Sequence, residues 1–219
     1  EALGKVMKPG LAASGLVCGQ TLARQGEKDA AEQVFLMVGG LDGAPAHVRL
    51  SAMMQSVVLQ QDEAFDLLSA GLSAQNEQVF STGLRAARLL DNEIAVKAVI
   101  DSMQSAPPDH TARLITLLGD LAEPAGLPIV TSADRSSDVD VRIAALAALG
   151  EIGTAKQVEL VMDAAADDVE EVASRAIETL ASLPGDDVDQ AVLDLLDDTG
   201  RQAVAIRIIG RRRIKDAVP

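Results

Sequence analysis

The sequence predicts an all-α fold, a solenoid built from a repeated pair of short helices. Apolar residues recur with a period of about 31 residues, they follow helical spacing within each period, and strand-like alternation is absent. Counting Val17 as position 0 of the first unit, steps of 31 residues and a last step of 29 reach further units near residues 48, 79, 110, 141, 172 and 201. One such pair is too small to bury a core alone, so we expect the units to stack on one another.

The first helix of each unit, the A helix, carries apolar or small residues at positions 0, 4 and 5, except for His110 and Arg201 at position 0. Position 4 is mostly small, which lets helices approach closely and lets a core form with three aromatic residues in the whole chain. Position 5 is apolar in every unit and is expected to be core: Leu22, Met53, Leu84, Ile115, Leu146, Ile177 and Ile206. Glycine recurs at position 9, where we expect it to end the A helix: Gly26, Gly119, Gly150 and Gly210. Acidic residues before the A helices, such as Asp138, predict helix caps.

The second helix, the B helix, carries apolar residues at positions 17, 19 and 20. Position 17 fails once, at Asp189, and Val188 fills that column if the preceding loop is shortened. Pro128 lies inside an expected B helix and predicts a short or distorted helix there. Other prolines fall at expected helix edges, where proline stops one helix or opens the next.

Positions 18 and 22 of the B helices lie one helical turn apart, on the side opposite the core positions. Acidic residues occupy about half of this row, and we predict that they bind a partner: Asp66, Asp101, Glu159, Asp163 and Asp194. Such a row would steer a basic protein, with association that weakens as salt rises. The alternative is a solvated face that keeps an alanine-rich chain in solution or reflects salt adaptation, since 21 Asp stand against 12 Glu.

Composition excludes several functions. The net charge of −14 repels nucleic acid and anionic lipid, so neither is an expected partner. With 1% aromatic residues the chain has no material for base-stacking platforms or aromatic cages. The single cysteine, Cys18, excludes an internal disulfide and a multi-cysteine metal site. Cys18 is expected to be a half-buried small residue near the start of an A helix, and we predict no metal and no cofactor.

The segment Asp140–Gly153 resembles the signature of HEAT repeats, and more narrowly the short bacterial and archaeal subclass first named for phycobilisome lyases. His47–Ala52 is similar to it again, and Thr116–Leu121 matches its second half. The resemblance implies a right-handed α-α superhelix with A helices on the convex side and B helices on the concave, partner-facing side. The family's arginine after the leading valine is present only as Arg49 and Arg142, so we expect no continuous Asp/Arg ladder.

The resemblance leaves the function open, because a fold hosts many activities. The leading hypothesis is a non-catalytic protein–protein interaction scaffold that uses its concave B-helix face. The alternatives are a chromophore-lyase-type subunit and a structural spacer module of a larger secreted or periplasmic bacterial protein. The family's di-iron hydroxylases need repeated His-Glu pairs, whereas His47 and His110 are followed by Val48 and Thr111. His110 falls in a core column, which favours a buried structural imidazole.

We expect residues 1–219 to form a single repeat domain that is a fragment of a longer chain, since the first residue is Glu and another helix is expected to begin near the C-terminus. Lys5 and Lys8 before an uncharged run resemble a signal peptide, but the run falls in register with the repeat. The compartment stays open between cytoplasmic and periplasmic or secreted. Arg211–Arg213 with Arg207 and Lys215 form a basic end, expected to complement a helix dipole and acidic groups of a following repeat.

Overall fold

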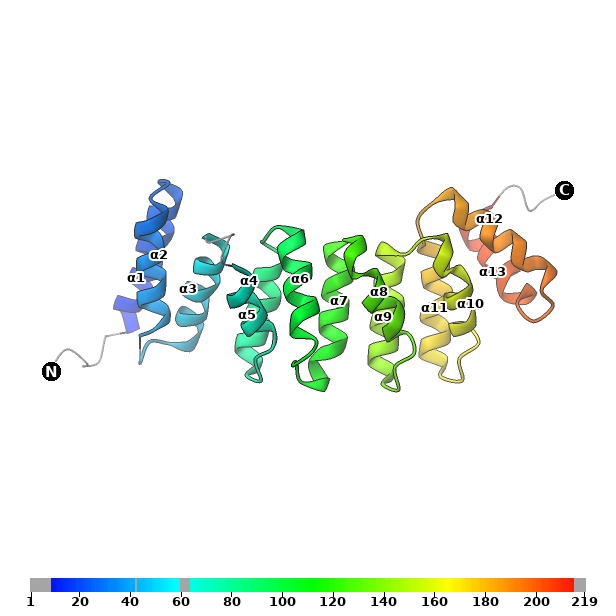
Figure 1. Cartoon of the computed structure of the whole chain (residues 1–219), viewed down its shortest axis with the longest axis horizontal. Coiled ribbons are helices and arrows are strands. Elements are labelled where there is room, and N and C mark those ends of the chain that lie inside the picture. Colours follow the sequence, from blue (N-terminus) through cyan, green and yellow to red (C-terminus); the bar gives the residue numbers. More distant parts are fainter. Residues whose placement is uncertain (1–8, 42, 60–63, 215–219) are drawn as a thin grey trace. The chain divides into compact units, whose positions relative to one another are not determined.

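The computed structural model describes residues 9–41, 43–59 and 64–214 of the chain, and the described residues form helices joined by turns, with no strand (Figure 1). The α-helices are α1 Pro9–Arg24, α2 Lys28–Gly39, α3 Ala46–Leu59, α4 Ala64–Leu72, α5 Glu77–Ala87, α6 Asn92–Ser102, α7 Thr111–Leu121, α8 Leu127–Ala133, α9 Val139–Ile152, α10 Val158–Ala164, α11 Glu170–Ser182, α12 Asp186–Asp194 and α13 Gln202–Arg212. Short 3-10 helices cover Pro108–His110, Pro124–Gly126, Ala155–Gln157 and Leu195–Asp197. The predicted all-α repeat fold is confirmed.

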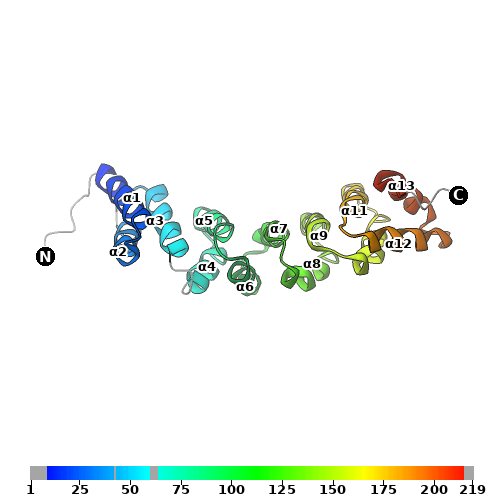
Figure 2. The same ribbon diagram turned by 90° about the horizontal axis from the view of Figure 1, so that it is seen from above.

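The odd-numbered helices are the predicted A helices and the even-numbered ones the B helices. The chain divides into two compact units, Glu1–Pro107 and Pro108–Pro219, here called unit 1 and unit 2. Their boundary falls between the third and the fourth repeat. Within each unit the A helices form one layer and the B helices the other (Figure 2). That both units together make one domain stays a prediction.

The core is made from two columns that the sequence predicts. Position 4 of the A helix is buried in every repeat after the first, at Ala52, Gly83, Leu114, Ala145, Ala176 and Ala205. Position 20 of the B helix is likewise buried from the second repeat on, at Leu68, Val99, Val130, Val161 and Val192. Val188 is fully buried while its neighbour Asp189 is not, which confirms the shortened loop. His110 is buried as expected.

Position 5 of the A helix is a core column only in part. Leu146 is fully buried and Ile177 is 8% exposed, but Ile206 is 58% and Met53 45% exposed, so the prediction was wrong at these two positions. Position 5 is covered by the next A helix, and no later helix of the described residues packs on α13, which contacts α11, α12 and Leu195–Asp197. Met53 instead borders a pocket between α3 and α5.

The prediction that glycine at position 9 ends the A helix was wrong for three of the four glycines. Gly119, Gly150 and Gly210 lie inside α7, α9 and α13, and only Gly26, with φ +84°, follows the end of its helix. A Cβ on Gly119 would lie 2.8 Å from the Cα of Ala148 on α9. Glycine at this site therefore permits close helix packing rather than a left-handed turn.

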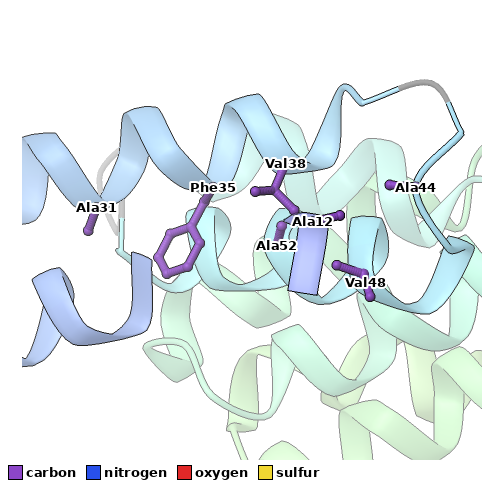
Figure 3. Packing of buried hydrophobic residues seen from close by; sticks show 7 residues of the cluster. All are labelled: Ala12, Ala31, Phe35, Val38, Ala44, Val48 and Ala52. Atoms are coloured by element: carbon purple, nitrogen blue, oxygen red, sulfur yellow. The ribbon is translucent and has the colours of Figure 1, made fainter. Parts of the chain in front are cut away.

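The first three helices share a core around Phe35, which points from α2 toward α1 (Figure 3). Gly19 on α1 leaves room for this ring, since a Cβ there would lie 2.5 Å from the Phe35 ring. Gly15, one turn earlier, makes room for Val38 in the same way. Two glycines one turn apart thus let α1 and α2 pack closely despite the large aromatic side chain.

Other local predictions have mixed outcomes. Asp138 caps α9, because its carboxylate accepts hydrogen bonds from the backbone N–H groups of Asp140 at 2.9 Å and Val141 at 3.3 Å. Pro128 lies in the first turn of α8, a helix of seven residues, so the short helix is confirmed. Cys18 is exposed and lies in the middle of α1, which corrects both its expected burial and its expected place near a helix start.

Polar contacts connect successive repeats in unit 2. The Thr179 hydroxyl on α11 donates a buried hydrogen bond of 2.8 Å to the Leu146 carbonyl on α9. Arg142 on α9 pairs with Asp167 at 3.3 Å in the turn before α11. In unit 1 the second family arginine, Arg49, donates instead to the Gly39 carbonyl at 3.2 Å. The two arginines therefore make different contacts, as expected for a chain without a continuous ladder.

The predicted basic end is used differently from the expectation. The Arg212 side chain turns back onto the preceding repeat and donates to Asp189 at 2.6 Å and to the Leu183 carbonyl at 2.7 Å. It also donates to the carbonyls at the end of α11, those of Leu180 at 3.2 Å and Ala181 at 3.3 Å. The guanidinium thereby satisfies orphan carbonyls of α11 and complements its dipole. Arg207, Arg211 and Arg213 are exposed, and Lys215 lies outside the described residues.

Candidate functional site

From the second repeat on, the row at positions 18 and 22 of the B helices is exposed at every position, whereas in the first repeat these positions hold the buried Phe35 and Gly39. The row consists of Asp66, Ala70, Lys97, Asp101, Pro128, Ser132, Glu159, Asp163, Gln190 and Asp194. The predicted orientation of the five acidic residues away from the core is therefore correct. Asp66 and Asp101 lie in unit 1 and the other three in unit 2.

In unit 1 the two acidic residues differ in what they contact. Asp101 on α6 accepts a short hydrogen bond from the Ser69 hydroxyl on α4. The Ser105 hydroxyl repeats this link one turn later by donating to the Ser73 hydroxyl at 3.1 Å. Asp66 lies at the start of α4, is exposed and forms no ion pair with a described residue. Asp101 thus helps to hold α4 and α6 together, whereas the Asp66 carboxylate can pair with a cation of a bound partner.

In unit 2 helices α10 and α12 are in contact and carry Glu159, Asp163 and Asp194. Arg201, just before α13, pairs with Asp163 at 2.6 Å. Asp194 accepts a hydrogen bond of 2.7 Å from the Gln190 amide, one turn earlier in the same row. Glu159 forms no hydrogen bond or ion pair with any described residue. The charge of Asp163 is compensated within the chain, so Glu159 and Asp194 carry the uncompensated negative charge of this row.

An acidic residue that the sequence prediction missed lies close to this region. Asp134 follows α8, and one of its carboxylate oxygens is buried without a hydrogen-bond partner. Burial raises the pKa of the Asp134 carboxyl above its ordinary value of 3.8, while the guanidiniums of Arg135 and Arg142 oppose that shift. Nearby carboxylates, including Asp163, add to the increase. Only the folded structure brings these residues together, because they come from different repeats.

Acidic side chains are not confined to the B helices. On the A helices of unit 2, Glu170, Glu171 and Glu178 of α11 line a shallow depression of about 590 Å³ together with Ile143 of α9. Arg175 shares this depression and pairs with Glu178 at 3.0 Å. The acidity of this region therefore lies on both layers of unit 2.

Unit 1 contains an apolar pocket that the sequence analysis did not predict. It lies among α2, α3, α4 and α5 and has a volume of about 100 Å³. None of the described residues that line it is charged, and its rim includes the exposed side chains of Leu36, Met53 and Leu67. Ser56, on its wall, is 2% exposed, and its hydroxyl has no hydrogen-bond partner. The sequence does contain a signal for this pocket at repeat position 8. The second repeat has Ser56 there, whereas the next four repeats have Ala87, Leu118, Leu149 and Leu180.

Neither histidine belongs to a cluster of ligands. His47 is exposed in the first turn of α3, and His110 is buried before α7. No group of three or more His, Cys, Asp and Glu side chains in the described part of the chain is placed to hold a metal ion. Among the helices of residues 9–41, 43–59 and 64–214, none combines the length and the hydropathy needed to cross a bilayer.

Comparisons with known proteins agree with this architecture. The chain is similar to an archaeal HEAT-like repeats protein from Thermococcus onnurineus NA1, with 16% identity, a TM-score of 0.51, and coverage of 98% of this chain and 99% of that one. The complex of CpcE and CpcF of phycocyanin lyase from Nostoc sp. PCC7120 gives 15% identity and a TM-score of 0.42, with 96% of each chain covered. Among curated proteins none matches this sequence.

A family match identifies the repeat. The family model for HEAT repeats matches residues 96–181 and 129–210, which together make up more than half of the chain. The chain therefore belongs to the HEAT-repeat family.

Proposed function

We propose that this protein is a non-catalytic scaffold that binds another protein, or another domain of its own chain, along the exposed row of its B helices. The observation that carries this proposal is the exposure of all ten positions of that row. A repeat protein stacks each unit only on its neighbours, so it presents an extended surface that a partner can follow. The partner's contacts with this surface are proposed to include Asp66, Asp101, Glu159, Asp163 and Asp194.

The charge of the row favours a basic partner. Glu159 and Asp194 have no cationic partner within the described residues, so a lysine or arginine of a bound protein can pair with them. Exposed pairs of this kind accelerate and orient association more than they strengthen it, and salt screens them over about 8 Å at physiological ionic strength. Binding should therefore weaken as salt is raised.

A charge reversal on α10 and α12 tests the proposal. The double variant Glu159→Lys/Asp194→Lys removes both uncompensated charges and leaves the Asp163–Arg201 pair intact. Immobilised wild-type chain and variant are compared for the proteins that they capture from a lysate, at low and at high salt, with identification by mass spectrometry. We expect specific captured proteins to be lost with the double variant and reduced at high salt.

The matched control is Glu151→Lys, which reverses an exposed charge on the A helix α9. This control should capture the same proteins as the wild-type chain, and circular dichroism should show equal helicity for all variants. Identical capture by the wild-type chain and the double variant would remove the B-helix row of unit 2 from the function.

A further inference from the structure

The apolar pocket of unit 1 lies where the repeat pattern calls for a leucine. At position 8 the fourth, fifth and sixth repeats carry Leu118, Leu149 and Leu180, all fully buried. Ser56 stands at this position in the second repeat and lines the pocket. Replacing a leucine by a serine removes most of a side chain from a close-packed layer and leaves space that the neighbours cannot fill. The pocket therefore corresponds to the space that a buried leucine fills in the fourth to sixth repeats.

The rim of the pocket consists of core-type residues that the described chain does not cover. Met53 is at position 5, and Leu36 and Leu67 are at position 19, yet they are 45%, 54% and 43% exposed. Clustered exposed apolar side chains mark interaction sites. Methionine at such a site adapts to the shape of what binds.

Size and hydrogen bonding restrict what can enter. A volume of about 100 Å³ is below the roughly 300–1,000 Å³ of pockets that enclose drug-sized ligands, so the pocket takes a single side chain. The wall is apolar except for two hydroxyls, and that of Thr82 already donates to the Gln78 carbonyl at 2.8 Å. The Ser56 hydroxyl is buried and unpartnered, which is costly unless an occupant supplies the missing hydrogen bond. An apolar side chain with a hydroxyl at its tip meets both requirements, as tyrosine does.

An acidic residue next to Leu67 in sequence restricts the occupant further. Asp66 immediately precedes Leu67 on α4, is exposed and has no ion-pair partner among the described residues. A helix that inserts a tyrosine beside Leu67 can place a lysine or arginine one turn away, opposite Asp66. None of the described residues that line the pocket is charged, so Asp66 supplies the charge for this pairing.

We propose that this pocket binds a basic amphipathic helix of a partner protein, which inserts one tyrosine side chain against Ser56 and pairs a cation with Asp66. This rests on the proposed function, because Asp66 belongs to the exposed B-helix row, and it deepens that function by naming a pocket in unit 1 and the chemistry of the side chain that enters it. It adds an anchor point with defined chemistry to the scaffold.

A synthetic helical peptide tests the proposal directly. The probe is a fluorescein-labelled peptide of roughly four helical turns with one tyrosine flanked by lysines one turn away, titrated with the full chain and followed by fluorescence anisotropy. We expect saturable binding, about 3–10-fold weaker binding when phenylalanine replaces the tyrosine, and weaker binding when glutamates replace the lysines. Ser56→Ala should abolish the preference for tyrosine over phenylalanine, whereas an equal affinity of wild-type chain for both peptides would overturn the role of Ser56.

Two further variants separate binding from folding. Ser56→Leu restores the leucine of the later repeats, so it should raise the melting temperature while abolishing peptide binding, a combination that damage to the fold cannot produce. Leu67→Asp should weaken binding at least tenfold, whereas Leu89→Asp, on an exposed leucine of unit 1 outside the pocket, should leave it unchanged. Peptide binding that survives both Ser56→Leu and Leu67→Asp would overturn the proposal. The Glu159→Lys/Asp194→Lys variant should bind the peptide normally, so failure here is distinguishable from failure of the proposed function.

Discussion

Two glycines at the same repeat position should respond in opposite ways to the same substitution. Gly119 in α7 and Gly210 in α13 both occupy position 9 and both lie inside a helix. A Cβ on Gly119 would meet the backbone of Ala148 on α9, whereas a Cβ on Gly210 would have no atom within 4 Å. Gly119→Ala should therefore destabilise the protein, and Gly210→Ala should stabilise it.

The geometry sets the size of each effect. To move the new methyl group from 2.8 Å to an ordinary contact of 3.4 Å, α7 and α9 must separate by about 0.6 Å. Overpacking of this kind costs about 1–3 kcal/mol, and the helix preference of alanine over glycine returns about 0.5–1 kcal/mol. The net loss at Gly119 is thus about 0.5–2 kcal/mol. At Gly210 only the gain of about 0.5–1 kcal/mol applies.

Urea unfolding followed by circular dichroism measures both effects, and thermal melts report them as shifts of about 2–4 °C per kcal/mol in a chain of this size. Repeat proteins can unfold in stages, so the midpoint of the first transition is compared as well as the whole curve. A Gly119→Ala variant as stable as the wild-type chain would refute the close approach of α7 and α9. A Gly210→Ala variant less stable than the wild-type chain would refute the open surface at α13.

Three further predictions concern polar groups. Arg212→Met should lower the free energy of unfolding by about 3–5 kcal/mol because it strips partners from Asp189 and from several carbonyls, while Arg211→Met, on an exposed side chain, should stay within about 0.5 kcal/mol in urea unfolding. Thr179→Val should cost about 0.5–1.5 kcal/mol, since it removes one buried hydrogen bond between α11 and α9; equal stability in thermal melts would contradict this. Burial raises the pKa of the Asp134 carboxyl, so its ionisation opposes folding, and stability is lost as the pH rises from 3.8 through the folded-state pKa. Asp134→Asn should therefore gain stability relative to the wild-type chain at pH 7 compared with pH 3, and a difference that does not change with pH would contradict the shift.

The repeat and its main core columns follow from the sequence because helical spacing and period leave few alternatives. Ala145 and Val161 are buried as predicted, since a small or branched apolar residue at a recurring position has no better place than the layer between helices. The exposure of Met53 and Ile206 could not be predicted in the same way. Burial at their position depends on how closely the next helix packs, which is a property of the neighbouring repeat.

The glycine prediction was wrong for a related reason. A left-handed helix end and a close helix contact both favour glycine, so the residue type alone cannot separate them. Gly119 and Gly150 each come two residues before their helices end, and the turn after α7 uses Ala122 in the left-handed conformation instead. The structure assigns these glycines to packing.

Part of the candidate site also depended on tertiary contacts. The exposure of Glu159 and Asp194 was predictable from helical phase. The pairing of Asp163 with Arg201 was not, because the two residues are 38 positions apart and meet only in the folded structure. The pocket in unit 1 corresponds to a sequence signal, a serine where the fourth to sixth repeats have leucine, but only a structure shows that no other described side chain fills the space.

The contacts of Arg212 have a consequence for how the C-terminal half can be divided. Its guanidinium donates hydrogen bonds both to a carboxylate of α12 and to carbonyls at the end of α11. Helix α13 therefore stabilises the two helices of the sixth repeat against each other. A fragment that ends before α13 would leave those acceptors without their donors. It would also expose the side of α11 that carries the buried Ala176. The smallest stable fragment of unit 2 should consequently extend past Arg212, and a fragment that ends before α13 should melt at a lower temperature.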